Sequence, residues 1–244
     1  LITKTTIGVS YKKDKWDELE RLREQILFLN DCRLDPPRYE EKLSILNRIL
    51  ELDPQDKHTW MSKGDILFEL AREGFYDKLD ADRKNLAYES LQSHENALEI
   101  DSDFIWALLG KGNTLMLLSK FEGAIRCYDK IMGMDKIMEI DEPVDIVWFN
   151  KGLALQNLKK YDEALKCFDI FSSLEEENKT DQEMLYRKYQ TLMMMGRKKE
   201  AIACYELAFD SKPIDFSSRD WTKYVYYLGL GVFFAICFGI RHAL

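Results

Sequence analysis

Apolar residues recur at intervals of three or four along nearly all of residues 14–215, with charged residues between them. This spacing gathers apolar side chains on one face of a helix and therefore predicts helices rather than strands. A clear instance near the N-terminus comprises Trp16, Leu19, Leu22, Ile26 and Leu29. Pro54 and Pro213 each predict a helix end, because proline cannot continue the hydrogen-bond ladder. We expect an all-α chain whose first helix begins at about Asp14, with residues 1–12 unassigned.

Two short motifs alternate along these predicted helices. The first is Lys-Gly-x-x-Leu, in which the glycine is Gly64, Gly112 or Gly152. The second places alanine four residues before an aromatic side chain, in the pairs Ala124 and Tyr128, Ala164 and Phe168, and Ala201 and Tyr205. Small residues allow two backbones to approach closely. We therefore expect the glycines and alanines to face one another and the aromatic rings to fill the space between neighbouring repeats.

Together the two motifs resemble the tetratricopeptide repeat, a helix–turn–helix unit of about 34 residues. The resemblance covers residues 23–215 and is read as about five repeats, at 23–56, 57–102, 105–138, 145–178 and 182–215. It implies that residues 13–215 form an array of stacked helix pairs, a right-handed α-solenoid superhelix. The inner groove of such a superhelix is lined by the first helix of each repeat.

The repeats depart from the family pattern at three places. The second repeat carries about fourteen extra residues near Glu73–Leu86, and a smaller insertion precedes the fourth repeat near Lys136–Val144. The first repeat has Asn30 and Lys42 where glycine and alanine would be expected. We expect the first repeat to be a degenerate N-terminal cap, since repeat arrays need atypical terminal units.

The pattern changes near the C-terminus, where residues 224–240 contain no charged residue. From Trp221 to Ile240 a helix would span about 30 Å, the thickness of the hydrocarbon core of a bilayer. The aromatic residues at its start suit a membrane interface: Trp221, Tyr224, Tyr226 and Tyr227. We predict a juxtamembrane linker at 216–223, a transmembrane helix at 224–240 and a tail at 241–244. The alternative is a buried helix that caps the repeats, which should keep a polar face that this run lacks.

Small residues recur at every fourth position of the apolar run, at Gly231, Ala235 and Gly239. They would lie on one helix face and let a second transmembrane helix approach, although glycine is also frequent in membrane helices generally. Arg219 and Lys223 precede the run and Arg241 follows it, a bias that favours a cytoplasmic repeat domain. Five cysteines without a CxxC pair suit the same reducing compartment.

Charge and motif content narrow the functional classes. The formal net charge is −8, with basic residues interspersed among acidic ones, which argues against nucleic-acid binding. None of the three histidines has a second metal ligand at useful spacing, and no phosphate-binding glycine loop or nucleophile elbow is present. Cys127, Cys167 and Cys204 each precede a repeated aromatic residue, so we expect packing rather than chemistry. We therefore expect that the protein is not an enzyme and that it binds neither a cofactor nor a metal ion.

The resemblance also implies which residues line the groove. These positions are Met61, Asp65 and Phe68, then Trp106, Leu109, Asn113 and Met116, then Phe149, Leu153 and Gln156, and finally Tyr186, Gln190 and Met193, with His58, Ile146 and Glu183 completing the set. The set is mostly apolar and aromatic, which suits an amphipathic helix or an extended apolar peptide as partner. Alternatively, residues 1–12 or the long insertion fill the groove.

Two functional hypotheses remain open. The first is a membrane-anchored scaffold or adaptor, in which the groove binds a protein or peptide partner without catalysis. The second is an accessory subunit of a membrane protein complex, held mainly by its transmembrane helix. Substitution of Gly231 and Ala235 by leucine separates them, because loss of co-purifying membrane proteins would favour the second.

Overall fold

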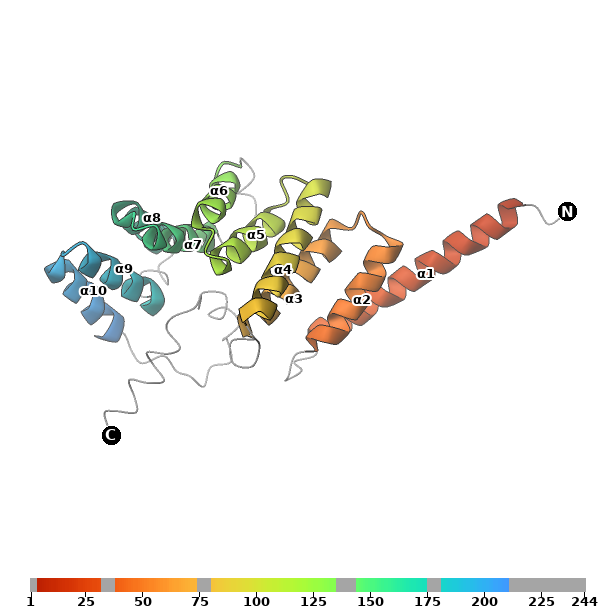
Figure 1. Ribbon diagram of the computed structural model, residues 1–244, viewed down its shortest axis with the longest axis horizontal. Helices are drawn as coiled ribbons and strands as arrows, with labels where there is room; N and C mark the ends of the chain where they lie inside the picture. The colour runs from red at the N-terminus through yellow and green to blue at the C-terminus, as the bar shows by residue number, and fades with distance from the viewer. Residues whose placement is uncertain (1–3, 32–37, 74–79, 135–143, 175–180, 211–244) are drawn as a thin grey trace, which may run out of the picture. The chain divides into compact units, whose positions relative to one another are not determined.

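The computed structural model describes residues 4–31, 38–73, 80–134, 144–174 and 181–210. These residues form ten α-helices and no strand, which confirms the all-α prediction (Figure 1). The helices are α1 (Lys4–Asp31), α2 (Tyr39–Leu52), α3 (Lys57–Glu73), α4 (Asp80–Ile100), α5 (Ile105–Leu117), α6 (Phe121–Met132), α7 (Val144–Asn157), α8 (Tyr161–Leu174), α9 (Gln182–Met194) and α10 (Lys198–Asp210).

The helices belong to two compact units. The first unit ends at Ser119 and contains α1 to α5, and the second begins at Lys120 and contains α6 to α10. Within each unit every helix packs against the next one along the chain, while α3 also contacts α5 and α7 also contacts α9. Contacts between helices that are adjacent or next but one along the chain are typical of helical repeats.

Two glycines of the Lys-Gly motif, Gly64 and Gly152, lie against a ring of the following helix. A β-carbon on Gly64 would lie 2.6 Å from Cε1 of His94, and one on Gly152 would lie 2.5 Å from Cε1 of Phe168. Because interiors are close-packed, any larger residue at these positions would force the two helices apart. The alanines of the second motif are fully buried: Ala124, Ala164 and Ala201.

Two lysines of the Lys-Gly motif, Lys111 and Lys151, and Lys188 on α9 each form an ion pair with an acid of the preceding helix. The recurring ion pairs are Lys111 with Glu95 at 2.9 Å, Lys151 with Asp129 at 2.6 Å, and Lys188 with Asp169 at 2.6 Å. In each pair the acid directly follows the ring position of the preceding helix pair. Partly exposed pairs of this kind contribute about 0–1 kcal/mol each. Their effect is therefore to favour one register between neighbouring helices more than to supply stability.

Helix boundaries differ from the sequence-based expectation at two places. α1 begins at Lys4 rather than at about Asp14, because no proline interrupts the backbone before Asp14. The insertion expected at 73–86 is partly helical, since α4 begins at Asp80 and is 21 residues long. The extra residues of the second predicted repeat therefore lengthen a helix as well as a connection.

The rings expected between repeats differ in burial. Tyr128 and Phe168 are fully buried, whereas Tyr205 keeps 44% of its surface exposed, since it lies on α10, the last helix that the structure describes. Cys127 and Cys167 are buried beside the two enclosed rings. Burial raises the pKa of Cys167 to about 11, so this thiol stays protonated at neutral pH. It then packs as a small apolar group.

Among the residues that the structure describes, no helix combines the length and the apolarity needed to cross a membrane. The predicted linker at 216–223, transmembrane helix at 224–240 and tail at 241–244 lie outside these residues. The same holds for the predicted packing face of the transmembrane helix, which comprises Gly231, Ala235 and Gly239.

Candidate partner-binding surface

Three of the predicted groove residues share one face of α3. Met61, Asp65 and Phe68 stand four and three positions apart, so their side chains emerge on the same side of the helix. All three are half-buried. Met61 also packs against a buried cluster of Ala97, Phe104 and Ala107. This face of α3 is thus both attached to the core and accessible from outside.

Of the predicted groove residues on α5, three are half-buried and one is not accessible. The half-buried residues are Trp106, Asn113 and Met116. Trp106 packs against the same buried cluster as Met61. Leu109 is only 7% exposed and belongs to the core, so the structure removes it from the candidate surface.

The predicted groove positions on α7 are mostly internal. Phe149 is fully buried, and its ring centroid lies 5.9 Å from that of Phe168 and 5.3 Å from that of Phe171. Leu153 is 7% exposed, and Ile146 is 4% exposed. The physical reason for the burial of Phe149 is that the rings of Phe168 and Phe171 on α8 pack against it. Phe149 and Leu153 therefore pack the core instead of lining a groove.

The predicted positions on α9 are more accessible. Tyr186 and Gln190 are half-buried, and Met193 is 41% exposed. The side-chain amide of Gln156 on α7 already makes an internal hydrogen bond, because its Nε2 donates to Oγ1 of Thr191 at 3.0 Å. Glu183 is 9% exposed and therefore also internal. In this unit the accessible candidates are the three residues of α9 together with the half-buried Gln156.

A buried polar cluster in the first unit was not anticipated from the sequence. Oγ of Ser90 donates to the carbonyl oxygen of Gly64 at 2.8 Å and lies 3.0 Å from Oγ1 of Thr114. Ser90, His94 and Thr114 are all fully buried. Ser90 and His94 stand four residues apart, at the places that alanine and an aromatic residue hold in the other repeats. The four-residue spacing of Ser90 and His94 matches that of the alanine and aromatic motif. The match was missed because serine and histidine are polar and the motif was defined by alanine and an aromatic residue.

His94 is enclosed between two glycines. A β-carbon on Gly64 would meet its ring at 2.6 Å, and one on Gly110 at 2.3 Å. Within the described ranges, neither Nδ1 nor Nε2 has a hydrogen-bond partner. Burial, assisted by the positive charge of Lys111, lowers the pKa of His94 to about 4. The imidazole is therefore neutral at physiological pH.

Asp65 of α3 lies close to this imidazole. Its Oδ1 lies 3.8 Å from Nε2 of His94, which is longer than a hydrogen bond. The side chain of Asp65 is nevertheless 44% exposed. Desolvation, together with the negative charge of Glu69, raises the pKa of Asp65 to about 7. An accessible carboxyl thus lies in front of an enclosed histidine.

Ser90, His94 and Asp65 are the residue types of a hydrolytic triad, but their arrangement does not support nucleophilic catalysis. A nucleophilic serine must be reachable and must give its proton to the imidazole. Ser90 is fully buried and donates to a carbonyl oxygen instead. Within the described ranges, no group of three His, Cys, Asp or Glu side chains is arranged to hold a metal ion.

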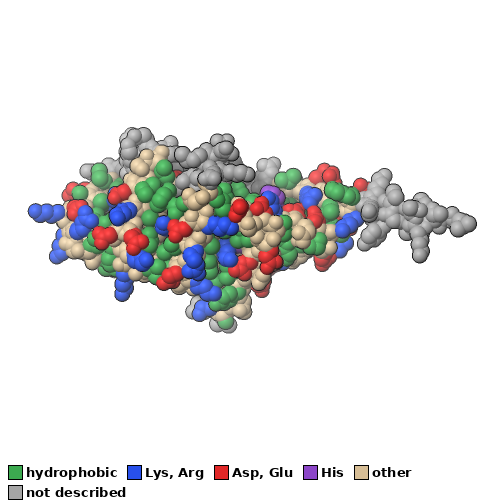
Figure 2. All heavy atoms as spheres, turned by 90° about the horizontal axis from the view of Figure 1, so that it is seen from above, with side chains coloured by type: hydrophobic (Ala, Val, Ile, Leu, Met, Phe, Trp, Pro, Cys, Tyr) green, Lys and Arg blue, Asp and Glu red, His purple; other side chains and the backbone are tan. Residues whose placement is uncertain are grey.

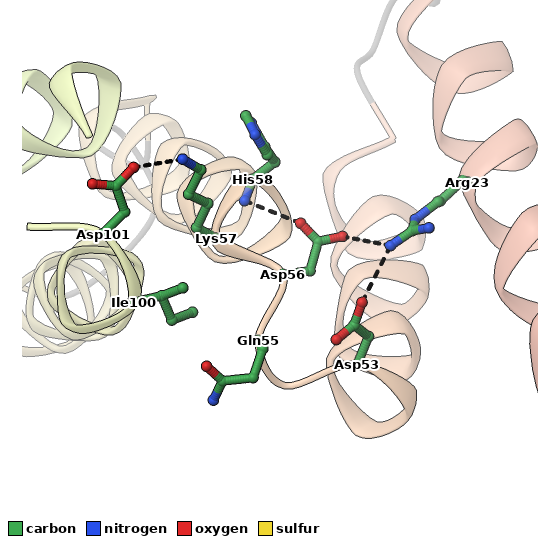
Figure 3. Close-up of a pocket in the computed structure, with 8 residues that line it drawn as sticks. All are labelled: Arg23, Asp53, Gln55, Asp56, Lys57, His58, Ile100 and Asp101. Carbon is green, nitrogen blue, oxygen red and sulfur yellow. Dashed lines mark hydrogen bonds and ion pairs between the residues drawn. The ribbon is translucent and has the colours of Figure 1, made fainter. Parts of the chain in front are cut away.

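A cavity of about 750 Å³ lies where the turn between α2 and α3 meets the end of α4 (Figure 3). It is lined by Arg23, Asp53, Gln55, Asp56, Lys57, His58, Ile100 and Asp101. Arg23 reaches Asp56 at 3.0 Å and Asp53 at 3.4 Å. Lys57 reaches Asp101 at 2.5 Å. The charges in this cavity are therefore largely compensated within the chain.

Asp56 in this cavity also has a structural role. Its carboxylate accepts hydrogen bonds from the backbone N–H groups of His58 and Thr59, both at 3.1 Å. Burial alone would raise the pKa of Asp56, but the bonds from Thr59 and Arg23 outweigh it and lower the pKa. These hydrogen bonds are those of a helix N-cap, so Asp56 stabilises the N-terminus of α3.

The surface carries both signs of charge. Figure 2 shows Lys and Arg side chains intermixed with Asp, Glu and apolar ones over the face in view. Such mixing differs from the continuous basic surface with which proteins bind a phosphate backbone.

Comparison with known proteins agrees with the helix-pair reading. A family model described as "Tetratricopeptide repeat" matches residues 146–169 and 183–215. No curated protein matches the sequence. Among solved structures, a crystal structure of MamA protein superposes with a TM-score of 0.60 at 11% identity, covering 86% of this chain and 97% of the other.

Two further solved structures are similar in fold. MamA residues 41 to the end from Desulfovibrio magneticus RS-1 gives a TM-score of 0.62 at 13% identity, covering 80% of this chain and 94% of the other. Pseudomonas aeruginosa pilF gives 0.61 at 16% identity, covering 92% and 87%. At these identities the likeness concerns the fold alone. The chain therefore contains tetratricopeptide repeats and has an all-α fold like that of MamA and pilF.

Proposed function

We propose that this protein is a scaffold or adaptor that binds a protein or peptide partner on the first helices of its repeats, without a chemical step. The observation that carries the proposal is the accessible face of these helices. On α3 this face comprises Met61, Asp65 and Phe68, and on α9 it comprises Tyr186, Gln190 and Met193. Tetratricopeptide repeats are protein-interaction modules, which supports the same assignment.

The chemistry of this face favours an amphipathic partner. It presents aromatic and methionine side chains around single polar groups, and methionine adapts to partners of varied shape. Each apolar side chain covered by the partner contributes about 25 cal/mol per Å² removed from water. An amphipathic helix or an extended apolar peptide meets these requirements.

We further propose that residues 224–240 hold the repeats at a membrane. The proposal rests on the sequence of that segment, which is uncharged over a length sufficient for a thin bilayer. The repeats would then bind their partner close to the bilayer, on the side favoured by Arg219 and Lys223.

The binding proposal is tested with charge introduced into the accessible face. We expect Phe68→Glu and Met193→Glu each to reduce recovery of the partner by about tenfold or more, because a charge would be desolvated in the interface. The tagged full chain is purified from detergent-solubilised membranes, and co-purifying proteins are quantified by mass spectrometry.

Tyr88→Glu is the matched control, because Tyr88 is 49% exposed and lies on α4, the second helix of its pair. We expect this variant to retain the wild-type set of co-purifying proteins. If both face variants also retain that set, the first helices do not form the interface and the binding proposal is wrong.

A further inference from the structure

The carboxyl of Asp65 is accessible and lacks a partner among the described residues. Its side chain is 44% exposed, and its contact with Nε2 of His94 at 3.8 Å is too long for a hydrogen bond. Four other acids of this unit are paired with basic side chains: Asp53, Asp56 and Asp101 with Arg23 or Lys57, and Glu95 with Lys111. Among the described residues, Asp65 is therefore a carboxyl on the candidate binding face that has no basic side chain paired with it.

His94 stands directly behind this carboxyl and is also incomplete. It is fully buried, and both of its ring nitrogens lack hydrogen-bond partners in the part of the chain that the structure describes. Gly64 and Gly110 lie against the ring so closely that a β-carbon on either would meet it at less than 3 Å. A buried polar group without a hydrogen-bond partner is energetically unfavourable. Such a group in a folded protein therefore calls for an explanation, such as a bound ligand that satisfies it or a functional role. Its exposed neighbour Asp65 provides the route to such a partner.

The surroundings of Asp65 indicate which chemical group would complete it. Met61 lies one turn before Asp65 on the same face of α3 and Phe68 lies one turn after it, so the carboxyl is flanked by apolar side chains. Glu69, the next acid along the helix, forms an ion pair with Arg72. An anionic group would be repelled by these two acids. An apolar group would desolvate Asp65 and leave both it and His94 without hydrogen bonds.

We propose that Asp65, supported by His94, is the subsite for a lysine or arginine side chain of the partner. This inference rests on the partner-binding function proposed above and specifies the chemistry of that partner. The cationic head pairs with the Asp65 carboxylate, and the aliphatic stem lies along Met61 and Phe68, as long basic side chains do on apolar surfaces. His94 acts as a positioning residue, because its neutral ring can donate from Nε2 to the carboxylate once the cation holds Asp65 ionised.

The subsite is tested with small probes on the full chain in detergent micelles. The probes are n-butylguanidinium and its neutral isostere n-butylurea, and the readout is the methyl NMR signal of Met61 in protein labelled at the methionine methyl groups. We expect n-butylguanidinium to shift this signal at concentrations about tenfold lower than n-butylurea, because only the cation pairs with Asp65. Equal effects of the two probes, or no effect of either, would overturn the proposal.

Variants assign the preference to Asp65. Asp65→Asn keeps the shape of the side chain but removes its charge, and we expect the two probes to become equivalent. Asp82→Asn removes an exposed acid of α4 and should leave the preference intact. His94→Phe, which introduces the residue found at the matching position 168, should weaken the preference without abolishing it. A preference that survives in Asp65→Asn would place the cation elsewhere.

The probe comparison on the wild-type chain requires neither a variant nor a natural partner. Its failure would therefore remove the cation subsite while leaving the wider binding proposal open to its own test. Conversely, unchanged co-purification by the Phe68 and Met193 variants would contradict the wider proposal without altering the affinity of Asp65 for a cation.

Discussion

At the residue scale, His94 shows how a repeat position can be filled by an atypical side chain. It lies where Tyr128 and Phe168 lie in later repeats, and it is equally buried. The rings of Tyr128 and Phe168 are uncharged at neutral pH, whereas the imidazole of His94 can be protonated and is stable in this buried site only in its neutral form. The position thereby makes the stability of the first unit dependent on pH.

We predict that His94→Phe raises the free energy of unfolding by about 1–2 kcal/mol at neutral pH, because it removes two buried nitrogens without partners. The pKa of His94 falls from 6.5 in the unfolded chain to about 4 in the folded one. Its contribution to stability is therefore complete above pH 6.5 and is lost as the pH falls towards 4, by up to about 3 kcal/mol. Urea unfolding of both proteins across this range provides the measurement. Parallel pH profiles would contradict the burial of a neutral imidazole.

Asp65 should show the opposite pH dependence. Its pKa is raised from 3.8 to about 7, so ionisation of the folded chain is disfavoured and stability declines as the pH rises through this interval. We predict that Asp65→Asn stabilises the protein above pH 7 by about 1 kcal/mol, a value reduced for the partial exposure of the side chain. The gain should fade as the pH approaches 3.8. A stability difference that does not change with pH would contradict this account.

At the scale of elements, three helix–helix turns use the same backbone conformation. Ser119, Lys159 and Gly196 follow α5, α7 and α9, and all have positive φ, of 57°, 60° and 75°. In each turn the N–H of this residue donates to a carbonyl three residues earlier, at 2.9, 2.9 and 3.0 Å. Only glycine adopts this conformation without steric strain.

We predict that Lys159→Gly raises the free energy of unfolding by about 0.5–1 kcal/mol, because relief of the strained φ exceeds the added entropy of the unfolded chain. The reverse change, Gly196→Ala, should lower it by about 1 kcal/mol. No atom lies within 4 Å of a β-carbon on Gly196, so the effect is one of backbone strain alone. Thermal unfolding of the two variants is the measurement, and changes of the same sign in both would contradict the explanation.

The same elements show what sequence reasoning can and cannot supply. Helices and repeat phase follow from Gly64, Gly152, Ala124 and Ala164, since close packing requires small residues at fixed spacing. Ser90 and His94 were missed because their burial depends on enclosure by α3 and α5, which composition does not reveal. Phe149 and Leu153 were assigned to the groove from family position, whereas their burial depends on the side chains that pack against them, such as Phe168 and Phe171 against Phe149. Residue type specifies a helix face, but its neighbours determine whether that face is accessible.

At the scale of the whole molecule, the proposed membrane attachment separates two regions of different chemistry. Residues 4–210 supply the described helices, and the charge-free run lies beyond them at 224–240. Retention of the repeat fold should therefore be independent of attachment to the bilayer.

We predict that the full chain sediments with membranes and resists extraction by high salt, whereas a chain ending at residue 215 remains in the supernatant with unchanged helical circular dichroism. Gly231→Leu with Ala235→Leu keeps the run apolar and serves as the control for sedimentation. Loss of co-purifying membrane proteins in this control would favour the accessory-subunit hypothesis. Recovery of the full chain in the soluble fraction would contradict the anchor.

The enclosure of His94 behind Asp65 has a consequence for the lifetime of the protein in a cell. A cationic partner would bind only the folded chain, and a ligand of the folded state increases its resistance to unfolding in proportion to the logarithm of ligand concentration. Without the partner the first unit would open more often, and opened chains are removed by proteases. We therefore expect the abundance of this protein to follow that of its partner, with unassembled copies degraded first.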